Sequence, residues 1–422
     1  MKFDPGILRN YDIRGEYGKD FDDEFAERLG ASLVLHTKAK RLIVARDMRP
    51  SSEKIAAAVM KGITSAGCDV IDIGTASTPF CYYVVTSKDA PAGIMVTASH
   101  MGPRFNGFKI ALQNGTVLGK DSGLLPLIAL VKQDKFTQAD KGNVEQMDFV
   151  GIHAEDMIRF SGLLPGQISF RVALDVEPMI LTEVDSAFKM LDIQRVAIGE
   201  PYDIAFKCDA DGDRLSLFNK NGEEIRPDLY TGMIAGYFAQ KKTTEHPLQF
   251  INDLRASRGV REYLAHFPVR FISSKIGHTY IKLAMKKHDA DFCGEFSGHM
   301  MFKVTRYAES TLLAILIIIK IIAESGMSID QIIAPLDTWA HSGERNTPID
   351  GWPSSVPVVL SRVKQRFKDG VIDEIDGLKV DYPDWWFLIR ASANDPVIRL
   401  IVEAKTKEMM EAKVAELQKL ME

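Results

Sequence analysis

The chain has 422 residues, of which 46% are hydrophobic and 26% charged, the ordinary usage of a globular protein. This length predicts about two to four domains, because one hydrophobic core does not serve so long a chain. The formal net charge of −5 argues against a broad nucleic-acid surface, so an anionic substrate must be held by a local cluster of basic groups.

The first part of the chain alternates predicted strands and helices. A strand is predicted at 41–46, followed by a helix that Ser51 and Ser52 cap and that runs through Ser65 to stop at Gly67. Strands at 68–73 and 93–96 and a helix at 80–87 complete this segment. The alternation predicts a mainly parallel sheet covered by helices.

A polar stretch at 133–143 is the first predicted linker. After it come a strand at 170–175, a helix at 181–191, and strands at 195–198 and 202–208. Boundaries follow at the turn 219–222 and at Arg226-Pro227. A third unit ends near residue 337, and it contains a buried helix at 312–323 with Ser310 as its N-cap. Beyond a break at 351–353 lie a helix at 356–367, strands at 378–380, 386–390 and 397–404, and an amphipathic helix from 406. The predicted domains are therefore 1–142, 143–223, 224–340 and 341–422.

The cysteines, the N-terminal segment and the length of the apolar stretches indicate the cellular compartment. The four cysteines are scattered without CxxC spacing, which fits a reducing cytosol and argues against a zinc site. The N-terminus lacks the apolar core of a signal peptide, and the apolar run 312–319 is far shorter than the roughly 20 residues that span a bilayer. We expect a cytoplasmic protein with no membrane role and no nucleic-acid partner.

An acidic triplet follows the strand at 202–208. Asp209, Asp211 and Asp213 alternate with Ala210 and Gly212, and such a set can hold a hard divalent cation. Arg214 next to it is suited to gripping a phosphate that also touches the metal. An EF-hand is excluded, because its Gly and Glu positions carry Arg214 and Lys220. The alternative is an acidic surface turn.

Three further loops carry polar groups. Thr97-Ala98-Ser99-His100 follows a buried strand and is expected to present the Ser99 hydroxyl on an exposed loop, where His100, Lys109 or a metal could activate it. The absence of a GxSxG elbow argues against an ordinary serine hydrolase. Gly294–His299 and the preceding 273–278 segment offer donors and acceptors for vicinal hydroxyls. Arg390, Ser392 and Asn394, with Arg399 further on, can clamp a phosphate dianion. Each loop alone also fits a polar turn without a ligand.

The order of these four loops, one per predicted unit, resembles that of the phosphoglucomutase/phosphomannomutase family of α-D-phosphohexomutases. The resemblance begins at Tyr11-Asp12-Ile13-Arg14-Gly15 and spans nearly the whole chain. It implies an α/β fold of three similar domains with mixed, mainly parallel sheets, plus a C-terminal α+β domain, arranged around a central cleft. It also implies sugar phosphates as substrates, Mg²⁺ as the metal, a hexose 1,6-bisphosphate as activator, and a monomer or dimer.

The resemblance further implies a role for each loop. Ser99 is the residue carried as phosphoserine, and Asp209, Asp211 and Asp213 hold Mg²⁺ together with its phosphate. Glu295 and Ser297 bind sugar hydroxyls, while Arg390, Ser392 and Asn394 bind the other phosphate. Lys109 and His278 are candidates for the general base. The remaining expected site residues are His100, with Arg14, Arg214, Lys275, His299 and Arg399 at the substrate.

The chain departs from the family pattern at several positions. Met101 and Gly102 replace the usual Asn and Pro after the serine and histidine, Phe296 stands where Met is usual, and the second domain is short. The leading hypothesis is a mutase acting on mannose or glucose phosphates. A phosphoglucosamine mutase is the alternative within the class. A sugar-phosphate-binding protein with little turnover and a metal-dependent phosphatase are alternatives outside it.

Overall fold

The computed structural model describes residues 1–88, 90–133, 140–392 and 396–421. These residues form two compact units. Unit 1 comprises Met1–Ile225, Lys282–Phe292 and Ser297–Gly326, and unit 2 comprises Arg226–Ile281, Cys293–Phe296 and Met327–Glu422. The four domain boundaries expected from the sequence remain a prediction.

Unit 1 holds the elements of the first half of the chain and a later insertion. In chain order they are η1 (Pro5–Ile7), β1 (Ile13–Glu16), α1 (Asp23–Thr37), β2 (Arg41–Arg46), α2 (Ser52–Ser65), β3 (Asp69–Thr75), α3 (Thr78–Ser87), β4 (Ala92–Val96), β5 (Phe105–Leu112), η2 (Lys120–Leu124), α4 (Leu125–Lys132), β6 (Val144–Gln146), α5 (Val150–Ser161), β7 (Val172–Asp175), α6 (Pro178–Leu191), β8 (Arg195–Val196), β9 (Ile204–Cys208), β10 (Leu215–Asn219), β11 (Glu224–Ile225), β15 (Met300–Phe302), η3 (Lys303–Thr305) and α10 (Thr311–Ser325).

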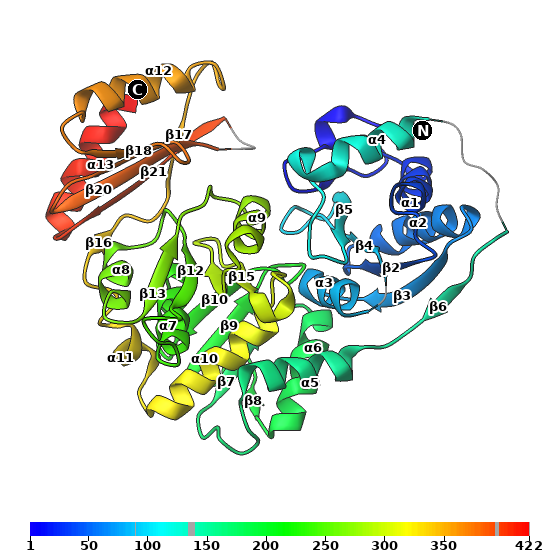
Figure 1. Cartoon of the computed structure of the whole chain (residues 1–422), viewed down its shortest axis with the longest axis horizontal. Coiled ribbons are helices and arrows are strands. Elements are labelled where there is room, and N and C mark those ends of the chain that lie inside the picture. The colour runs from blue at the N-terminus through cyan, green and yellow to red at the C-terminus, as the bar shows by residue number, and fades with distance from the viewer. Residues whose placement is uncertain (89, 134–139, 393–395, 422) are drawn as a thin grey trace. The chain divides into compact units, whose positions relative to one another are not determined.

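The first sheet of unit 1 has the strand order β1-β5-β4-β2-β3-β6. Its inner strand β2 runs parallel to β3 and β4, whereas β5 is antiparallel to β4 and β1. Side chains alternate between the two faces of a strand, so Leu42 and Val44 share one core with α1, α2 and α4. Helix α3 covers the other face (Figure 1). The expectation of a mixed, mainly parallel sheet between helices is confirmed.

The second sheet of unit 1 has the order β11-β10-β9-β7-β8. Strand β9 is parallel to β7 and antiparallel to β10, so the chain reverses between β9 and β10 at residues 209–214. Helix α10 begins where predicted, because the side chain of Ser310 accepts a hydrogen bond from the backbone N–H of Leu313. Its residues from Thr311 to Ile322 are buried.

Unit 2 contains the remaining helices and strands. They are α7 (Pro227–Ala239), β12 (Leu248–Asn252), α8 (Arg258–Leu264), β13 (Val269–Ile272), α11 (Ile329–Ile333), β16 (Ala340–His341), β17 (Arg345–Pro348), α12 (Val356–Arg366), β18 (Val371–Asp373), β19 (Leu378–Asp381), β20 (Trp385–Ala391), β21 (Val397–Ala404) and α13 (Lys407–Met421). Helix α9 (His278–His288) and strand β14 (Phe292–Gly294) have residues in both units.

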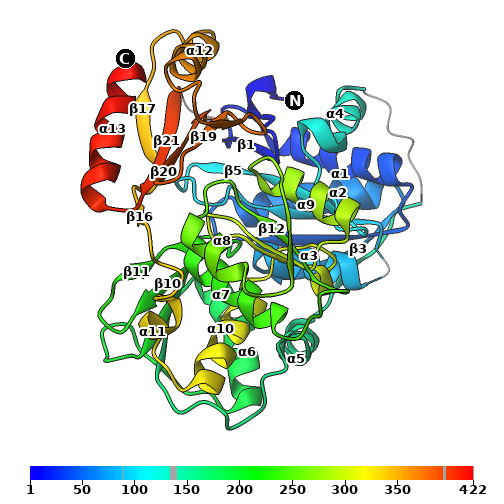
Figure 2. The same ribbon diagram turned by 60° about the vertical axis from the view of Figure 1, so that its left-hand side comes forward.

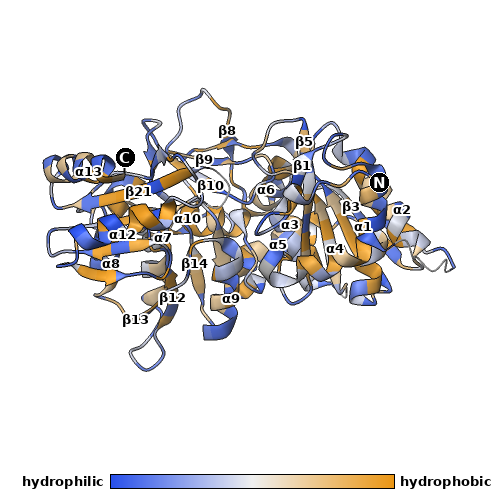
Figure 3. Ribbon diagram, turned by 90° about the horizontal axis from the view of Figure 1, so that it is seen from above, coloured by the Kyte–Doolittle hydropathy of each residue, from blue (hydrophilic) through white to orange (hydrophobic). Residues whose placement is uncertain are grey.

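The C-terminal sheet of unit 2 is antiparallel, with the order β16-β21-β20-β19-β18 and β17 also paired to β21. Helices α12 and α13 pack on one face of it (Figure 2). On the opposite face Trp386, Leu388 and Ile401 pack against Leu254 and Ile276, which lie in loops after β12 and β13. Hydrophobic residues gather along the inner strands, while the exposed side of α13 is hydrophilic (Figure 3).

Two local features differ from the sequence analysis. Strand β5 at 105–112 is absent from the elements expected from the sequence, because Asn106-Gly107 has the composition of a turn. A Cβ at Gly107 would lie 1.9 Å from the carbonyl oxygen of Ile13, so this glycine allows β1 to pair closely. Ser51 precedes α2 but makes no capping hydrogen bond, and its hydroxyl accepts from Asn106 at 2.9 Å.

The predicted linker at 133–143 falls largely outside the described residues. None of the described helices is long and apolar enough to cross a membrane.

Candidate active site

The three aspartates of the acidic loop converge. They follow β9, and each offers a carboxylate oxygen within 4.8 Å of the others. Gly212 makes the turn possible with a φ of +75°, and its carbonyl accepts a hydrogen bond of 2.9 Å from the Thr311 hydroxyl. Asp211 and Asp213 are buried. The loop is therefore a packed structure held from α10, and the solvated surface turn is not observed.

This carboxylate cluster fits a divalent metal. Oδ1 of Asp211 is buried without a hydrogen-bond partner, and the buried Oδ1 of Asp213 has only the looser contact of 3.4 Å with Nε2 of His299. Buried carboxylate oxygens without partners are costly, and oxygen donors are the ligands that Mg²⁺ prefers. Burial, followed by the charges of Asp213 and Asp211, raises the pKa of Asp209 to about 7. A cation at this position would relieve that repulsion.

Lys109 lies on the same cluster. From β5, its ammonium donates to Oδ2 of Asp211 at 2.6 Å and also pairs with Asp213. Burial alone would lower the pKa of Lys109, but Asp211 and Asp213 outweigh it and raise the pKa above its ordinary value. In this arrangement the side chain is a fixed positive charge. Its expected role as a base remains a prediction.

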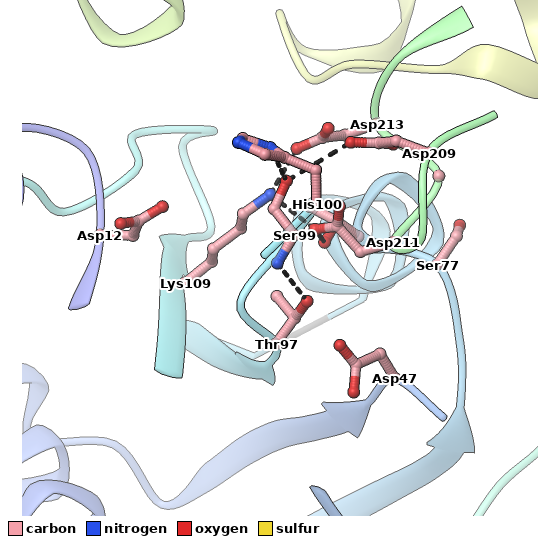
Figure 4. A network of polar contacts seen from close by, with 12 residues as sticks. Asp12, Asp47, Ser77, Thr97, Ser99, His100, Lys109, Asp209, Asp211 and Asp213 are labelled. Carbon is pink, nitrogen blue, oxygen red and sulfur yellow. Dashed lines mark hydrogen bonds and ion pairs between the residues drawn. The ribbon is translucent and has the colours of Figure 1, made fainter. Parts of the chain in front are cut away.

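Ser99 stands beside this cluster at the end of β4 (Figure 4). Its hydroxyl lies 3.4 Å from Oδ2 of Asp209 and 3.5 Å from Nδ1 of His100. Burial, followed by Arg214 and Arg14, lowers the pKa of His100. The expectation of an exposed serine was wrong, because Ser99 is only 1% exposed. Its backbone has a φ of +53°, a left-handed conformation that is strained for serine.

An arginine that sequence reasoning missed holds this strained turn. Arg49 donates to the carbonyl oxygen of Gly102 at 2.9 Å, to that of Phe105 at 3.2 Å, and to that of Ser99. The side chain of Arg49 is itself fixed by Asp47, at 2.8 Å between Nε and Oδ2. On the other side of the turn, the N–H of Ser99 donates to the Thr97 hydroxyl at 2.9 Å. The only available signal was the Asp-x-Arg spacing after β2.

A second support missed from the sequence links α3 to the acidic loop. Thr78, the first residue of α3, donates its hydroxyl to Oδ2 of Asp211 at 2.7 Å. Its neighbour Ser77 donates to Glu183 of α6 through both its N–H, at 2.8 Å, and its hydroxyl, at 2.7 Å. Burial raises the pKa of Glu183 to about 7, although the bonds from Ser77 lower it. Two sheets of unit 1 are thus joined at the site.

Basic groups of unit 1 surround the carboxylates. Arg14 of β1 pairs with Asp12 at 2.6 Å. Burial lowers the pKa of Arg14, but the combined effect of Asp12, Asp211 and Asp213 raises it above its ordinary value. The guanidinium of Arg214 lies 3.9 Å from Asp209, and its Nε is buried without a hydrogen-bond partner. His299 places Nε2 3.4 Å from Oδ1 of Asp213, and its Nδ1 is 3.0 Å from the hydroxyl of Ser297.

The other expected site residues lie in unit 2. Glu295 is buried and accepts a hydrogen bond of 3.2 Å from the N–H of Gly277. His278 begins α9, and the exposed Lys275 lies over the ring of Tyr280.

The expected phosphate loop also belongs to unit 2. Arg390 and Ser392 lie at the end of β20, and Arg399 of β21 donates to the Ser392 hydroxyl at 3.3 Å. Asn394 is outside the described residues. The expected residues are thus brought together in two groups. One group surrounds Ser99 in unit 1, and the other contains Glu295, Arg390, Ser392 and Arg399 in unit 2.

Three family models match the chain in order. Residues 6–135 match phosphoglucomutase/phosphomannomutase alpha/beta/alpha domain I, residues 226–338 match domain III, and residues 355–420 match the C-terminal domain. The phosphomannomutase of Methanocaldococcus jannaschii is 28% identical over 98% of this chain and 97% of its own length. The phosphoglucomutase of Neisseria gonorrhoeae is 27% identical over 96% and 94%.

A solved structure agrees at the level of the fold. The phosphoglucomutase/phosphomannomutase family protein of Burkholderia thailandensis superposes with a TM-score of 0.86 at 24% identity, covering 99% of this chain and 97% of that one. The chain belongs to the phosphoglucomutase/phosphomannomutase family and is a phosphohexomutase, an enzyme of the isomerase class.

Proposed function

We propose that the protein interconverts hexose 1-phosphate and hexose 6-phosphate, with mannose or glucose as the sugar, through a phosphoserine at Ser99. The observation that carries this proposal is the placement of the Ser99 hydroxyl 3.4 Å from Asp209, beside three convergent carboxylates. A serine held buried in a left-handed turn is fixed in position, as in-line phosphoryl transfer requires.

The reaction proceeds in two transfers. In the first, the bond between phosphorus and Oγ of phospho-Ser99 breaks as a bond to O6 of hexose 1-phosphate forms. The O6–H proton passes to a base, and Oγ of Ser99 takes up a proton. The product is the 1,6-bisphosphate. In the second, the bond between O1 and phosphorus breaks as Ser99 Oγ gives up its proton to a base and regains the phosphoryl group, and O1 takes a proton. The result is hexose 6-phosphate and the phosphoenzyme.

The residues around Ser99 supply charge and position. Mg²⁺, when held by Asp209, Asp211 and Asp213, would neutralise the phosphoryl oxygens. Arg214 has an unsatisfied buried N–H and can donate to the same phosphoryl group. Lys109, as an ammonium, adds a second fixed cation beside the aspartates. The candidates for the base that takes the proton of the sugar hydroxyl remain Lys109, which would first have to lose its proton, and His278.

In unit 2 we assign recognition of the rest of the substrate. Glu295, as a buried carboxylate, can accept hydrogen bonds from sugar hydroxyls. Ser297, the first residue of a segment that belongs to unit 1, can add a donor. Arg390, Ser392 and Arg399 can bind the phosphate that does not react. A hexose 1,6-bisphosphate would prime Ser99, because it can deliver a phosphoryl group to a dephosphorylated enzyme.

The test is a coupled assay with α-mannose, α-glucose and glucosamine 1-phosphates, Mg²⁺ and a trace of hexose bisphosphate. Wild type should form 6-phosphate from mannose or glucose 1-phosphate, and Ser99→Ala should not. Equal rates for the two proteins would exclude the phosphoserine mechanism. A preference for glucosamine 1-phosphate would assign the other mutase activity, and release of inorganic phosphate with free sugar would indicate a phosphatase.

A further inference from the structure

Two carboxylates in unit 2 hold the arginines of the expected phosphate loop. Oε1 of Glu344 accepts from Nη1 of Arg399 at 2.8 Å. Oδ2 of Asp376 accepts from Nη1 of Arg390 at 3.1 Å. Both pairs are partly buried, where ion pairs are less screened than at a fully exposed surface. No pattern in the sequence singled out either carboxylate.

Each pair engages only part of its guanidinium. Arginine has five N–H donors in a planar fork, so a carboxylate at one nitrogen fixes the side chain and leaves donors for another acceptor. In Arg390 the Nε group is buried without a hydrogen-bond partner. In Arg399 the second terminal nitrogen, Nη2, donates to Ser392 at 3.3 Å. Both carboxylates are therefore placed to orient the arginines and do not cover them.

Glu344 is linked to Glu295 through one buried arginine. Arg255 lies between them, with Nη1 3.6 Å from Oε2 of Glu344 and Nη2 3.9 Å from Oε1 of Glu295. Asp253 fixes Arg255 through bonds of 3.0 Å to Nε and 2.7 Å to Nη2. The ring of Phe296, next to Glu295, lies 5.7 Å from the same guanidinium. This path joins the phosphate loop to the sugar loop.

Asp376 is linked to Glu295 along a second path. The oxygen of Asp376 that receives Arg390 also accepts the N–H of Ile276 at 3.1 Å. The next N–H along the chain, that of Gly277, donates to Glu295 at 3.2 Å. Both paths, the first from Arg399 and the second from Arg390, end at Glu295. Together they form a ring of contacts within unit 2.

Hydrophobic packing holds the ring together. Ile276 of the second path packs with Leu254, next to Asp253, against Trp386 and Leu388 of β20. β20 ends next to Ser392 and carries Arg390. Because a packed core has few alternative arrangements, the two loops and the strand keep one spacing.

We propose that Glu344 and Asp376 are positioning residues that set the phosphate-binding arginines at a fixed distance from Glu295. This inference rests on the proposed function, in which Glu295 meets sugar hydroxyls and the arginines meet a phosphate. A hexose phosphate carries both groups on one rigid ring, so a fixed spacing favours binding of the two ends together. Inorganic phosphate contacts only the arginines.

The test uses the full chain with Glu344→Gln and Asp376→Asn, which keep the side-chain shapes and remove the charges. Calorimetry measures binding of inorganic phosphate, mannose 6-phosphate and glucose 6-phosphate, and the coupled assay measures turnover. We expect the Kd and KM for the preferred hexose phosphate to rise about tenfold in each variant, with kcat within about threefold of wild type. The Kd for inorganic phosphate should rise by a smaller factor than the Kd for the preferred hexose phosphate.

The matched control is Asp381→Asn, which removes an ion pair of 2.9 Å with Arg258 elsewhere in unit 2. It should leave all three affinities unchanged. A double variant of Glu344→Gln with Glu295→Gln separates positioning from a general loss of charge. In the Glu295→Gln background, the effect of Glu344→Gln should fall below about twofold, because linked residues are not additive.

The outcomes distinguish this inference from the proposed function. Unchanged Kd values, tighter phosphate binding, or full additivity in the double variant would overturn the positioning role while leaving the mutase activity intact. If wild type binds hexose phosphates without turnover, the proposed function fails and the binding experiments still decide the inference. If wild type binds neither phosphate nor hexose phosphates, both fail. A melting temperature for each variant identifies one that does not fold, and the other variant then carries the test.

Discussion

Thr78 donates its hydroxyl to Asp211 at 2.7 Å, and its backbone N–H donates to the carbonyl oxygen of the same residue at 2.8 Å. The first turn of α3 therefore fixes both the carboxylate and the backbone of a metal-binding candidate. Helix α3 packs on the first sheet of unit 1, whereas Asp211 lies in the loop between β9 and β10 of the second sheet. This contact sets the acidic loop against the Ser99 turn.

Thr78→Val should weaken Mg²⁺ binding and leave the fold intact. The substitution keeps the shape of the side chain and removes one buried hydrogen bond, a loss of about 1 kcal/mol or roughly fivefold in affinity. Activity measured against Mg²⁺ concentration should show a higher half-saturation and a similar maximum. Thr86→Val is the control, because the Thr86 hydroxyl donates to the carbonyl oxygen of Tyr83 within α3. Equal Mg²⁺ dependence in Thr78→Val and wild type would contradict this role.

Asp209→Asn should abolish phosphoryl transfer without unfolding the protein. Removing one of three like charges relieves repulsion in the metal-free protein, so its melting temperature should not fall. Wild type should gain about 2.7 kcal/mol of stability with Mg²⁺ at ~100 times its Kd, and the variant should gain little. Thermal melts with Mg²⁺ and with a chelator measure both effects.

The exposed Asp203 provides the control for the metal experiment, because it pairs with Arg171 away from the acidic loop. Asp203→Asn should keep both activity and the Mg²⁺-dependent shift. A full Mg²⁺ response in Asp209→Asn would show that the metal binds elsewhere.

Arg49→Lys should lower kcat by about 100-fold, because a misplaced reacting group loses most of the advantage of position. Lysine has one nitrogen and cannot bond three carbonyls of the Ser99 turn while also pairing with Asp47. KM should change much less, since Arg49 does not contact the expected substrate groups. The control Arg28→Lys changes an arginine of α1 that pairs with Glu24, and should be active. Wild-type kcat in Arg49→Lys would contradict a positioning role.

His153 should make the protein less stable in acid. It lies on α5, stacks on the ring of Phe80 and contacts the tilted ring of Tyr83, both on α3, and its buried Nδ1 has no hydrogen-bond partner. Burial lowers the pKa of His153 to about 3, although the charge of Asp156 raises it. In the unfolded chain, His153 therefore binds a proton below about pH 6.5, whereas in the folded chain it stays neutral down to about pH 3. Stability from this group is complete above the unfolded pKa and falls as the pH drops between these values.

His153→Phe should remove that dependence. Between about pH 6 and pH 4 the free energy of unfolding of wild type should fall by up to ~1.4 kcal/mol per pH unit more than that of the variant. Urea unfolding at several pH values measures the slopes. His266→Phe, at an exposed histidine of unit 2, should retain the wild-type slope. Parallel pH profiles for His153→Phe and wild type would exclude this source of acid sensitivity.

Much of the fold could be predicted, because periodicity and caps report on local structure. The strand at 41–46 and the helix end at Ser65 were placed to the residue, as was the Ser310 cap of α10. Strand β5 was missed because Asn106-Gly107 has the composition of a turn. This part of β5 pairs with β1, while β4 pairs with residues 108–112. Such pairing depends on residues nearly a hundred positions apart, which local patterns do not encode.

The site could be predicted where the residue type itself indicates the chemistry, as carboxylates indicate a metal and a serine hydroxyl indicates a nucleophile. The three aspartates and Ser99 stood out, and the structure brings them together. The residues that hold the Ser99 turn and the acidic loop in place did not stand out in the sequence. Arg49, Thr78 and Glu183 act through contacts with residues far along the chain. The burial of Ser99 was also misjudged. A loop rich in small residues is typical of exposure, but here Arg49 and the acidic loop enclose it.

The central claim, that Ser99 carries the phosphoryl group, is tested most directly by the intact mass of the protein. Purified wild type and Ser99→Ala are treated with phosphatase, incubated with hexose 1,6-bisphosphate and Mg²⁺, and weighed, and peptide mapping locates the added group. We predict that wild type gains the mass of one phosphoryl group on Ser99, that hexose phosphate removes it, and that Ser99→Ala gains nothing. A wild type that stays unmodified while turning over substrate, or an equal gain in Ser99→Ala, would contradict the claim.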